Sequence, residues 1–265
     1  MAFFLNPRMT PSTPSHDRLK LEPAGPEFPY HQGNPPTLSA RGWLLVMAGV
    51  VTGYIALTMP MPFTDTVLSG WLRVTAFVVL PLAGLAFAAP GHWKRLFRRV
   101  GGREVKLMFA FAFANIVVSM LIGTVIKTFG TTVSNAGIAD AAQLEGARLV
   151  NFFAKVAPQL LGEELLTLLP FLGILAFCQD RMGLSRNASV MMAWLVSAAA
   201  FGLVHLPTYD WNLMQCLVVI GSARLMLTWA YVWTKNIWVS TGAHILNDWA
   251  LLAFTVILTP LVPPT

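Results

Sequence analysis

The stretch "QLLGEELLTLLP", residues 159–170, places two adjacent glutamates inside a run of leucines. It lies within an apolar segment, Leu149 to Cys178, that exceeds the roughly 20 residues a helix needs to cross about 30 Å of membrane hydrocarbon. A charge at the centre of a membrane helix costs about 2.5–3.5 kcal/mol, and such residues usually face a cavity or a partner. The stretch therefore predicts a spanning helix that carries a polar site.

The whole chain has the composition of a membrane protein. Of its 265 residues, 55% are hydrophobic and 11% are charged, whereas a soluble domain carries roughly 25% charged residues. The apolar segments of spanning length are Gly42–Pro60, Leu68–Ala89, Val105–Lys127, Leu149–Cys178, Ala188–His205, Asn212–Thr234 and Ile237–Leu258. The sequence predicts an all-α, polytopic transmembrane helical bundle of seven or eight spans, because a soluble fold could not cover so much apolar surface.

The basic residues of the loops predict an orientation. The stretch "GHWKRLFRRVGGREVK", residues 91–106, separates the second span from the third, and the next alternate loops hold Arg181, Arg186 and Lys235. The intervening loops around Asp65 and Asp210 carry no Lys or Arg. By the positive-inside rule the basic loops and the amino terminus are cytoplasmic. The net charge of +6 is thus explained by topology and by contact with anionic lipid headgroups, not by a nucleic-acid partner.

The first forty residues differ from the rest. They hold eight of the eighteen prolines and show almost no hydrophobic periodicity. We expect residues 1–40 to form a disordered cytoplasmic tail, followed by a transmembrane domain over residues 41–265.

Several ionisable side chains fall inside the predicted spans. On the fourth span, Lys155, Gln159 and Glu163 recur at a spacing of four and share one stripe, whereas Glu164 points about 100° away. The two glutamates therefore have different roles. Glu163 could act as a general base or acid, or it could pair with Lys155 or with an arginine of another span and stabilise the bundle.

Two further spans carry histidines. The fifth ends in "FGLVH", Phe201 to His205, and the seventh contains "HILND", His244 to Asp248, with Asn247 beside the acid. A histidine and a carboxylate four residues apart can fix the tautomer of the ring or build a metal site. The alternative is a pair of hydrogen-bonding residues that joins two helices.

The three motifs occur in the order Glu-Glu, Phe-x-x-x-His and His-x-x-x-Asp over residues 149–250. This arrangement resembles the CPBP family of membrane endopeptidases, the CAAX proteases and bacteriocin-processing enzymes also called the Abi family, whose motifs are EExxxR, FxxxH and HxxxN/D. One position departs from that pattern, because Leu168 stands where the family has arginine. The departure disfavours the subtype that trims prenylated proteins. Arg224, in the sixth span, is a candidate substitute partner for Glu164 or Asp248.

The resemblance implies an intramembrane endopeptidase of the bacterial inner membrane that acts on a membrane-associated peptide or protein. Peptide hydrolysis needs an activated water and a group that stabilises the oxyanion. We expect Glu163 to take the proton from water, His205 to help hold that water and His244 to donate to the oxyanion. Asp248 would orient His244, be protonated or bind a cation, and Asn247 could supply a further donor. Glu164 belongs to the same predicted catalytic set.

Two alternatives remain open at this stage. His205, His244 and Asp248 are ordinary zinc ligands, although the chain has no HExxH helix and metal-independent chemistry is favoured. The same buried polar residues could serve a proton-coupled transporter or a non-catalytic scaffold, although no related halves are visible in the sequence.

The depths of the two histidines conflict. At about 1.5 Å per residue, His205 lies near the outer end of its span and His244 about seven residues from the inner end of its own. They could not share a substrate atom unless a predicted span boundary is wrong, the fifth helix is tilted or displaced, or the sixth segment is partly re-entrant. Boundary error is the expected cause.

Overall fold

The protein folds into a helical bundle. The computed structural model describes residues 18–31, 34, 36–59, 66–130, 132–141 and 143–258. The α-helices are α1 (Ala40–Thr58), α2 (Val67–Ala88), α3 (Gly102–Phe129), α4 (Ala136–Ala141), α5 (Gly146–Asp180), α6 (Arg186–Val204), α7 (Gly221–Thr234) and α8 (Ile237–Leu258). Two short 3₁₀ turns, η2 (Trp93–Leu96) and η3 (Leu206–Tyr209), and a π-helix, η4 (Gln215–Ile220), join them.

Each predicted span coincides with a long helix, so the prediction of an all-α membrane bundle is confirmed. Among the described residues, six helices are long and apolar enough to cross a membrane: α1, α2, α3, α5, α6 and the continuous run of η4 and α7. The seventh predicted span is α8, which has 22 residues and carries the polar His244, Asn247 and Asp248. The chain is a multi-pass integral membrane protein.

Side-chain caps fix where several helices begin. The Ser39 hydroxyl accepts from the Gly42 amide at the start of α1. Thr66 and Ser69 form a reciprocal capping box at the start of α2, and Ser185 caps α6. These hydroxyls satisfy amide groups that have no partner within the helix, which is the usual role of Ser and Thr at such positions.

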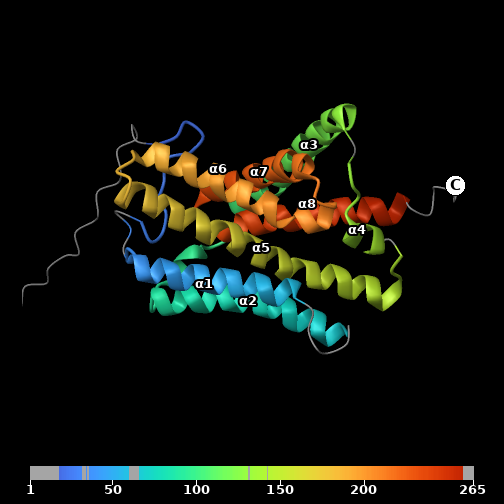
Figure 1. The fold of residues 1–265 in the computed structure, drawn as a ribbon, viewed down its shortest axis with the longest axis horizontal. Helices are drawn as coiled ribbons and strands as arrows, with labels where there is room; N and C mark the ends of the chain where they lie inside the picture. The colour runs from blue at the N-terminus through green and yellow to red at the C-terminus, as the bar shows by residue number, and fades with distance from the viewer. Residues whose placement is uncertain are drawn as a thin grey trace, which may run out of the picture.

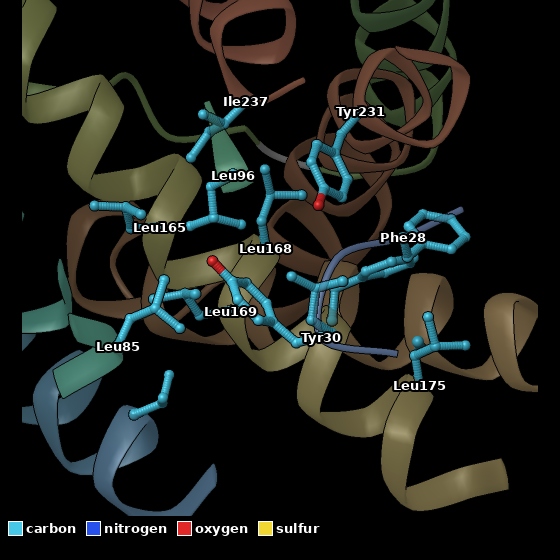
Figure 2. Packing of buried hydrophobic residues seen from close by; sticks show 14 of the residues in the cluster. Phe28, Tyr30, Leu85, Leu96, Leu165, Leu168, Leu169, Leu175, Tyr231 and Ile237 are labelled. Carbon is cyan, nitrogen blue, oxygen red and sulfur yellow. The ribbon is translucent and has the colours of Figure 1, made fainter. Parts of the chain in front are cut away.

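Helix α5 is the centre of the bundle. Its 35 residues continue through Pro158 and Pro170. Figure 1 shows α5 along the length of the molecule, with α1 and α2 on one side and α6, α7 and α8 on the other. Its leucines fill the main core, and Leu168 is fully buried there (Figure 2). Glu163 and Glu164 therefore lie on the helix that separates α1 and α2 from α6, α7 and α8.

Glycines allow α2 to approach its neighbours closely. A Cβ atom at Gly49 of α1 would lie 2.6 Å from the carbonyl oxygen of Leu80. A Cβ at Gly162 of α5 would clash with the ring of Phe77. Small residues at such crossings let membrane helices pack backbone against side chain. The second crossing places α2 directly beside the residue that precedes Glu163.

The described part of the amino-terminal region is packed, which corrects the prediction of disorder for residues 18–31. Phe28 and Tyr30 are buried among the leucines of α5 (Figure 2). The Tyr30 hydroxyl donates to the carbonyl oxygens of His92 and Trp93 at 2.9 and 3.0 Å. Residues 1–17 of the predicted tail lie outside the described residues. The aromatic anchors were missed because two isolated rings produce no periodic pattern.

Charges also hold this segment, at the end of the bundle where α5 ends and α6 begins (Figure 1). Glu22 lies 2.7 Å from Arg186 and 2.6 Å from Lys235, and Glu27 lies 2.8 Å from Arg186. Burial by itself would raise the pKa of Glu22, but the hydrogen bond from Arg186 and the charge of Lys235 hold it below its ordinary value. Two of the predicted cytoplasmic loop cations thus bind the amino-terminal segment.

Candidate active site

The candidate site lies where α5, α7 and α8 meet, and Glu164 is at its centre. This carboxylate is fully buried, with Oε1 2.7 Å from Arg224 Nη1 and Oε2 accepting from Arg224 Nη2 at 3.0 Å. Its Oε1 also lies 2.9 Å from Nδ1 of His244. A paired, ionised carboxylate is stable at this depth only with such donors. Glu164 therefore joins three helices and orients the histidine.

The two nitrogens of His244 have different surroundings. Because Glu164 is paired with a guanidinium, it accepts a hydrogen bond, so we assign the proton on Nδ1 to that contact. Nε2 faces Glu163 Oε2 at 3.9 Å and Asp248 Oδ1 at 3.7 Å. Both distances are longer than the donor–acceptor distance of a hydrogen bond. Nε2 is therefore the nitrogen that can meet a substrate or a water molecule.

Glu163 differs from its neighbour in exposure and in partners. Its side chain is 14% exposed, against 0% for Glu164. Oε1 accepts from Gln159 Nε2 at 3.3 Å, and within the described part of the chain its ion-pair contact is with His244 and not with Lys155 or an arginine. A polar cavity of about 410 Å³ between α2 and α5 includes Gln159 and Lys155 in its lining. Glu163 thus lies one helical turn from a hollow that water can fill.

Asp248 and Asn247 form a second polar group on α8. The Asp248 side chain is 34% exposed, and its Oδ1 accepts from Asn247 Nδ2 at 2.9 Å. The oxygen of Asn247 accepts from Asn115 Nδ2 at 3.0 Å, and both asparagines are buried. Asn247 therefore connects Asp248 to Asn115 of α3, and its side-chain NH₂ group already donates to Asp248. Sequence reasoning missed Asn115, although a single amide inside an apolar span is a signal that could have found it.

Phe201 connects the two histidines. Its ring centroid lies 4.5 Å from that of His205 and 6.5 Å from that of His244, and the Arg224 guanidinium carbon lies 5.1 Å from it.

The predicted bounds of the spans that carry the two histidines differ from those of α6 and α8 by at most two residues, so boundary error does not explain the predicted difference in depth between His205 and His244. Figure 1 shows α6 starting nearer the left end of the molecule than α8, so a displaced helix does. His205 Nδ1 is 2.7 Å from the carbonyl oxygen of Phe201.

The guanidinium expected from the family pattern comes from another helix. Arg224 of α7 contacts Glu164 and not Asp248, and its Nε donates to Thr228 at 3.3 Å. Leu168, at the position where the family has arginine, is buried in the apolar core. The charge that compensates Glu164 is therefore present, although its place in the sequence has moved from the fourth span to the sixth.

Two tyrosines outside the three motifs belong to the same surroundings. Tyr54 of α1 and Tyr209 of η3 lie close enough to Glu163 to interact with its charge. The Tyr54 hydroxyl donates to the carbonyl oxygen of Val204 at 3.0 Å, which ties α1 to the end of α6. Neither residue has a sequence signal, because a tyrosine in a span is normally read as an interface residue.

The predicted metal ligands do not form a ligand set. In the part of the chain that the structure describes, no three His, Cys, Asp or Glu side chains are arranged to hold a metal ion. His205, His244 and Asp248 are therefore not gathered as a zinc site in the part of the chain that the structure describes.

The comparison with protein families agrees with this geometry. A family model described as "Type II CAAX prenyl endopeptidase Rce1-like" matches residues 146–250. This match covers 105 of the 265 residues, and the matched segment is here named the Rce1-like domain. The Rce1-like domain includes α5, α6, α7 and the first part of α8, and it contains every predicted site residue. The predicted resemblance to the CAAX proteases is confirmed. Neither a curated protein nor a solved structure matches the chain.

Proposed function

We propose that the Rce1-like domain is an intramembrane endopeptidase that hydrolyses a peptide bond in a membrane-associated peptide or protein. One observation carries the proposal. Glu163 and Nε2 of His244 face each other at 3.9 Å, while Glu164 holds the opposite nitrogen of the same ring. A base and a donor on either side of a small gap are the groups that hydrolysis by water requires.

The proposed reaction begins with a water molecule beside Glu163. The Glu163 carboxylate takes a proton from this water while the water oxygen bonds to the carbonyl carbon of the substrate. His244 carries a proton on each ring nitrogen, and its Nε2–H donates a hydrogen bond to the oxyanion that forms. Glu163 then passes its proton to the amide nitrogen as the C–N bond breaks, which leaves a carboxylic acid and an amine. The carboxylate of Glu163 and the charge on His244 are regenerated.

The charges around His244 support the doubly protonated ring. Three carboxylates, Glu163, Glu164 and Asp248, contact this imidazole within 4 Å, and Arg224 compensates Glu164. Asp248 carries no donor proton as a carboxylate, so its role is to stabilise the positive ring on the Nε2 side. Asn247 keeps Asp248 in place. An oxyanion bound at Nε2 gains most when the ring is positive in the transition state.

The other predicted site residues act through position. Arg224 and Glu164 fix the His244 ring, and the Phe201 ring separates His205 from His244. We assign His205 to holding water at the outer side of that phenyl ring. Catalysis by the site depends on these supports because hydrolysis needs reacting groups within a few tenths of an ångström of their positions.

The proposed enzyme resides in a bacterial inner membrane, with the amino terminus in the cytoplasm. The basic residues Arg186 and Lys235 and the loop around Trp93 meet at one end of the bundle through the amino-terminal segment. A cluster of loop cations at one end is the pattern of a cytoplasmic face. We propose the lipid bilayer and a peptide substrate as its partners, and no nucleic acid.

The experiment compares the wild type and three variants of the detergent-purified protein on a fluorogenic peptide library. Glu163→Gln and His244→Ala should each lower the cleavage rate by about 10²-fold or more, the range of a general acid or base. Glu145→Gln, outside the site, serves as the matched carboxylate control and should cleave like the wild type. If all forms cleave equally, the peptidase assignment is wrong. Proton-coupled uptake into liposomes that depends on Glu163 would instead support the transporter.

A further inference from the structure

A basic cavity lies at the end of the bundle opposite the outer loops, away from the candidate active site. It encloses about 540 Å³ between the amino-terminal segment, the connection from α2 to α3, and the turn between α7 and α8. The basic side chains in its lining are Arg98, Arg99, Arg103 and Lys235. Gly25 forms part of the opposite wall.

The lining carries an excess of positive charge. Glu104 is its one acidic side chain, and Oε2 of this residue already accepts from the Gly101 amide at 2.9 Å. Glu104 interacts electrostatically with Arg103 and Arg98. Among the described residues, however, Arg98, Arg99 and Arg103 form no ion pair with any carboxylate. One carboxylate thus faces three guanidinium groups, so the cavity is suited to a ligand that brings negative charge.

A second cavity continues the first. It is an open cavity of about 560 Å³ and shares Pro26, Phe97, Arg98 and Lys235 with its neighbour. Lys94 and Arg95 add further positive charge to its wall. Glu27 also lines this cavity, but its carboxylate is bound by Arg186. The positive charge therefore extends over a surface larger than a single small anion.

Aromatic rings place the cavities at the depth of lipid headgroups. Trp233 lines the first cavity, and Trp93 and Trp238 pack on Phe97, which lines both. Tryptophans gather where the hydrocarbon of the bilayer meets its polar headgroups. Basic pockets at this level on the cytoplasmic side bind anionic headgroups, and a planar guanidinium matches a phosphate bidentately.

We propose that this pair of cavities binds the phosphate group of an anionic phospholipid from the cytoplasmic leaflet. Arg98, Arg99 and Arg103 provide the donors, and residues 23–26 of the amino-terminal segment complete the lining. The inference goes beyond the proposed hydrolysis and does not depend on it, because none of these residues contributes to the candidate active site.

The test measures lipid binding to the full-length protein by native mass spectrometry and by flotation with vesicles. Phosphatidylglycerol should bind at least about tenfold more tightly than phosphatidylcholine. The triple variant Arg98→Gln, Arg99→Gln, Arg103→Gln should lose this preference. The matched control Lys20→Gln, Arg41→Gln, Lys106→Gln removes the same charge from exposed sites that line neither cavity and should keep it.

A second pair of variants tests the wall of the cavity without touching an arginine. A Cβ atom at Gly25 meets nothing within 4 Å, so Gly25→Glu places a negative charge in the cavity with little disturbance. Gly25→Glu should weaken phosphatidylglycerol binding about tenfold, and Gly25→Gln should not. The proposed site would be wrong if both triple variants lost the preference for phosphatidylglycerol equally. It would also be wrong if Gly25→Glu and Gly25→Gln bound phosphatidylglycerol equally well. Competition by inorganic phosphate at the same concentration as lipid would overturn the assignment to a lipid.

Discussion

Glu164 and Arg224 form a fully buried ion pair that joins α5 to α7, with 2.7 Å between Oε1 and Nη1. The same carboxylate binds His244 of α8. The pair thus replaces, from a neighbouring helix, the charge that the family motif places one turn along α5. The two adjacent glutamates thus differ: Glu164 is bound by Arg224 and His244, whereas Glu163 accepts from Gln159 and faces Nε2 of His244 at 3.9 Å.

Removing the guanidinium should cost much of the stability of the protein. In the Arg224→Leu variant, Glu164 is buried without its cation, and breaking a buried pair in this way costs about 3–5 kcal/mol. We expect the temperature midpoint of unfolding in detergent to fall, and a fluorescence-based assay measures this midpoint. The exposed control Arg41→Leu, which lines neither basic cavity, should unfold like the wild type. If Arg224→Leu retained wild-type stability and cleavage, the ion pair would have no role.

The double variant Glu164→Gln, Arg224→Met separates charge from packing. Replacing both members of a buried pair by neutral groups is often nearly neutral for stability, because no uncompensated charge remains. We expect thermal stability close to that of the wild type, whereas cleavage stays low since His244 has lost its ionised partner. Recovered cleavage in the double variant would show that Glu164 does not act through His244.

The two single glutamine variants should behave differently. Glu163→Gln removes the proposed base, so we expect the cleavage rate to fall while the unfolding midpoint stays within a few degrees of the wild type. Glu164→Gln lowers both, because Arg224 is then a buried cation without a carboxylate. The comparison needs a cleavage assay and a thermal melt on the same samples. The reverse pattern, with Glu163→Gln the less stable variant, would mean that Glu163 is the structural acid.

Restoring the family arginine should harm this protein. Leu168 is fully buried among apolar residues of the core. An arginine there adds a buried cation where Arg224 already serves Glu164, so Leu168→Arg should destabilise the fold by several kcal/mol. Leu168→Met, which conserves volume, is the control and should cost less than about 1.5 kcal/mol. Folded and active Leu168→Arg protein would contradict this reading of the core.

Much of the architecture follows from local patterns in the sequence. The apolar segments predicted the long helices because every backbone amide and carbonyl in a membrane must be paired within its own helix. The spacing of four between Gln159 and Glu163, and between His244 and Asp248, likewise predicted which side chains share a face. The bounds of the helices that carry these residues were accordingly close to the observed ones.

The rest depends on contacts between helices, which the sequence does not encode locally. Arg224 could have met Glu164 or Asp248, and only the packing of α7 against α5 decides between them. The burial of Phe28 and the pairing of Glu22 with Arg186 join residues more than 140 positions apart. A segment without periodicity can still be ordered when other elements supply its partners.

Acid should release the amino-terminal segment. Burial would raise the pKa values of Glu22 and Glu27, but hydrogen bonds from Arg186 hold both below the ordinary value of 4.5. Stabilisation from a lowered carboxyl pKa is present above 4.5 and is lost as pH falls through the folded-state pKa. Hydrogen exchange of residues 18–31 should therefore accelerate, after correction for intrinsic rates, from pH 7 to pH 3. In Arg186→Met the segment should exchange fast at both pH values. Protection that acid does not change in the wild type would contradict a role for the ion pairs of Arg186 with Glu22 and Glu27.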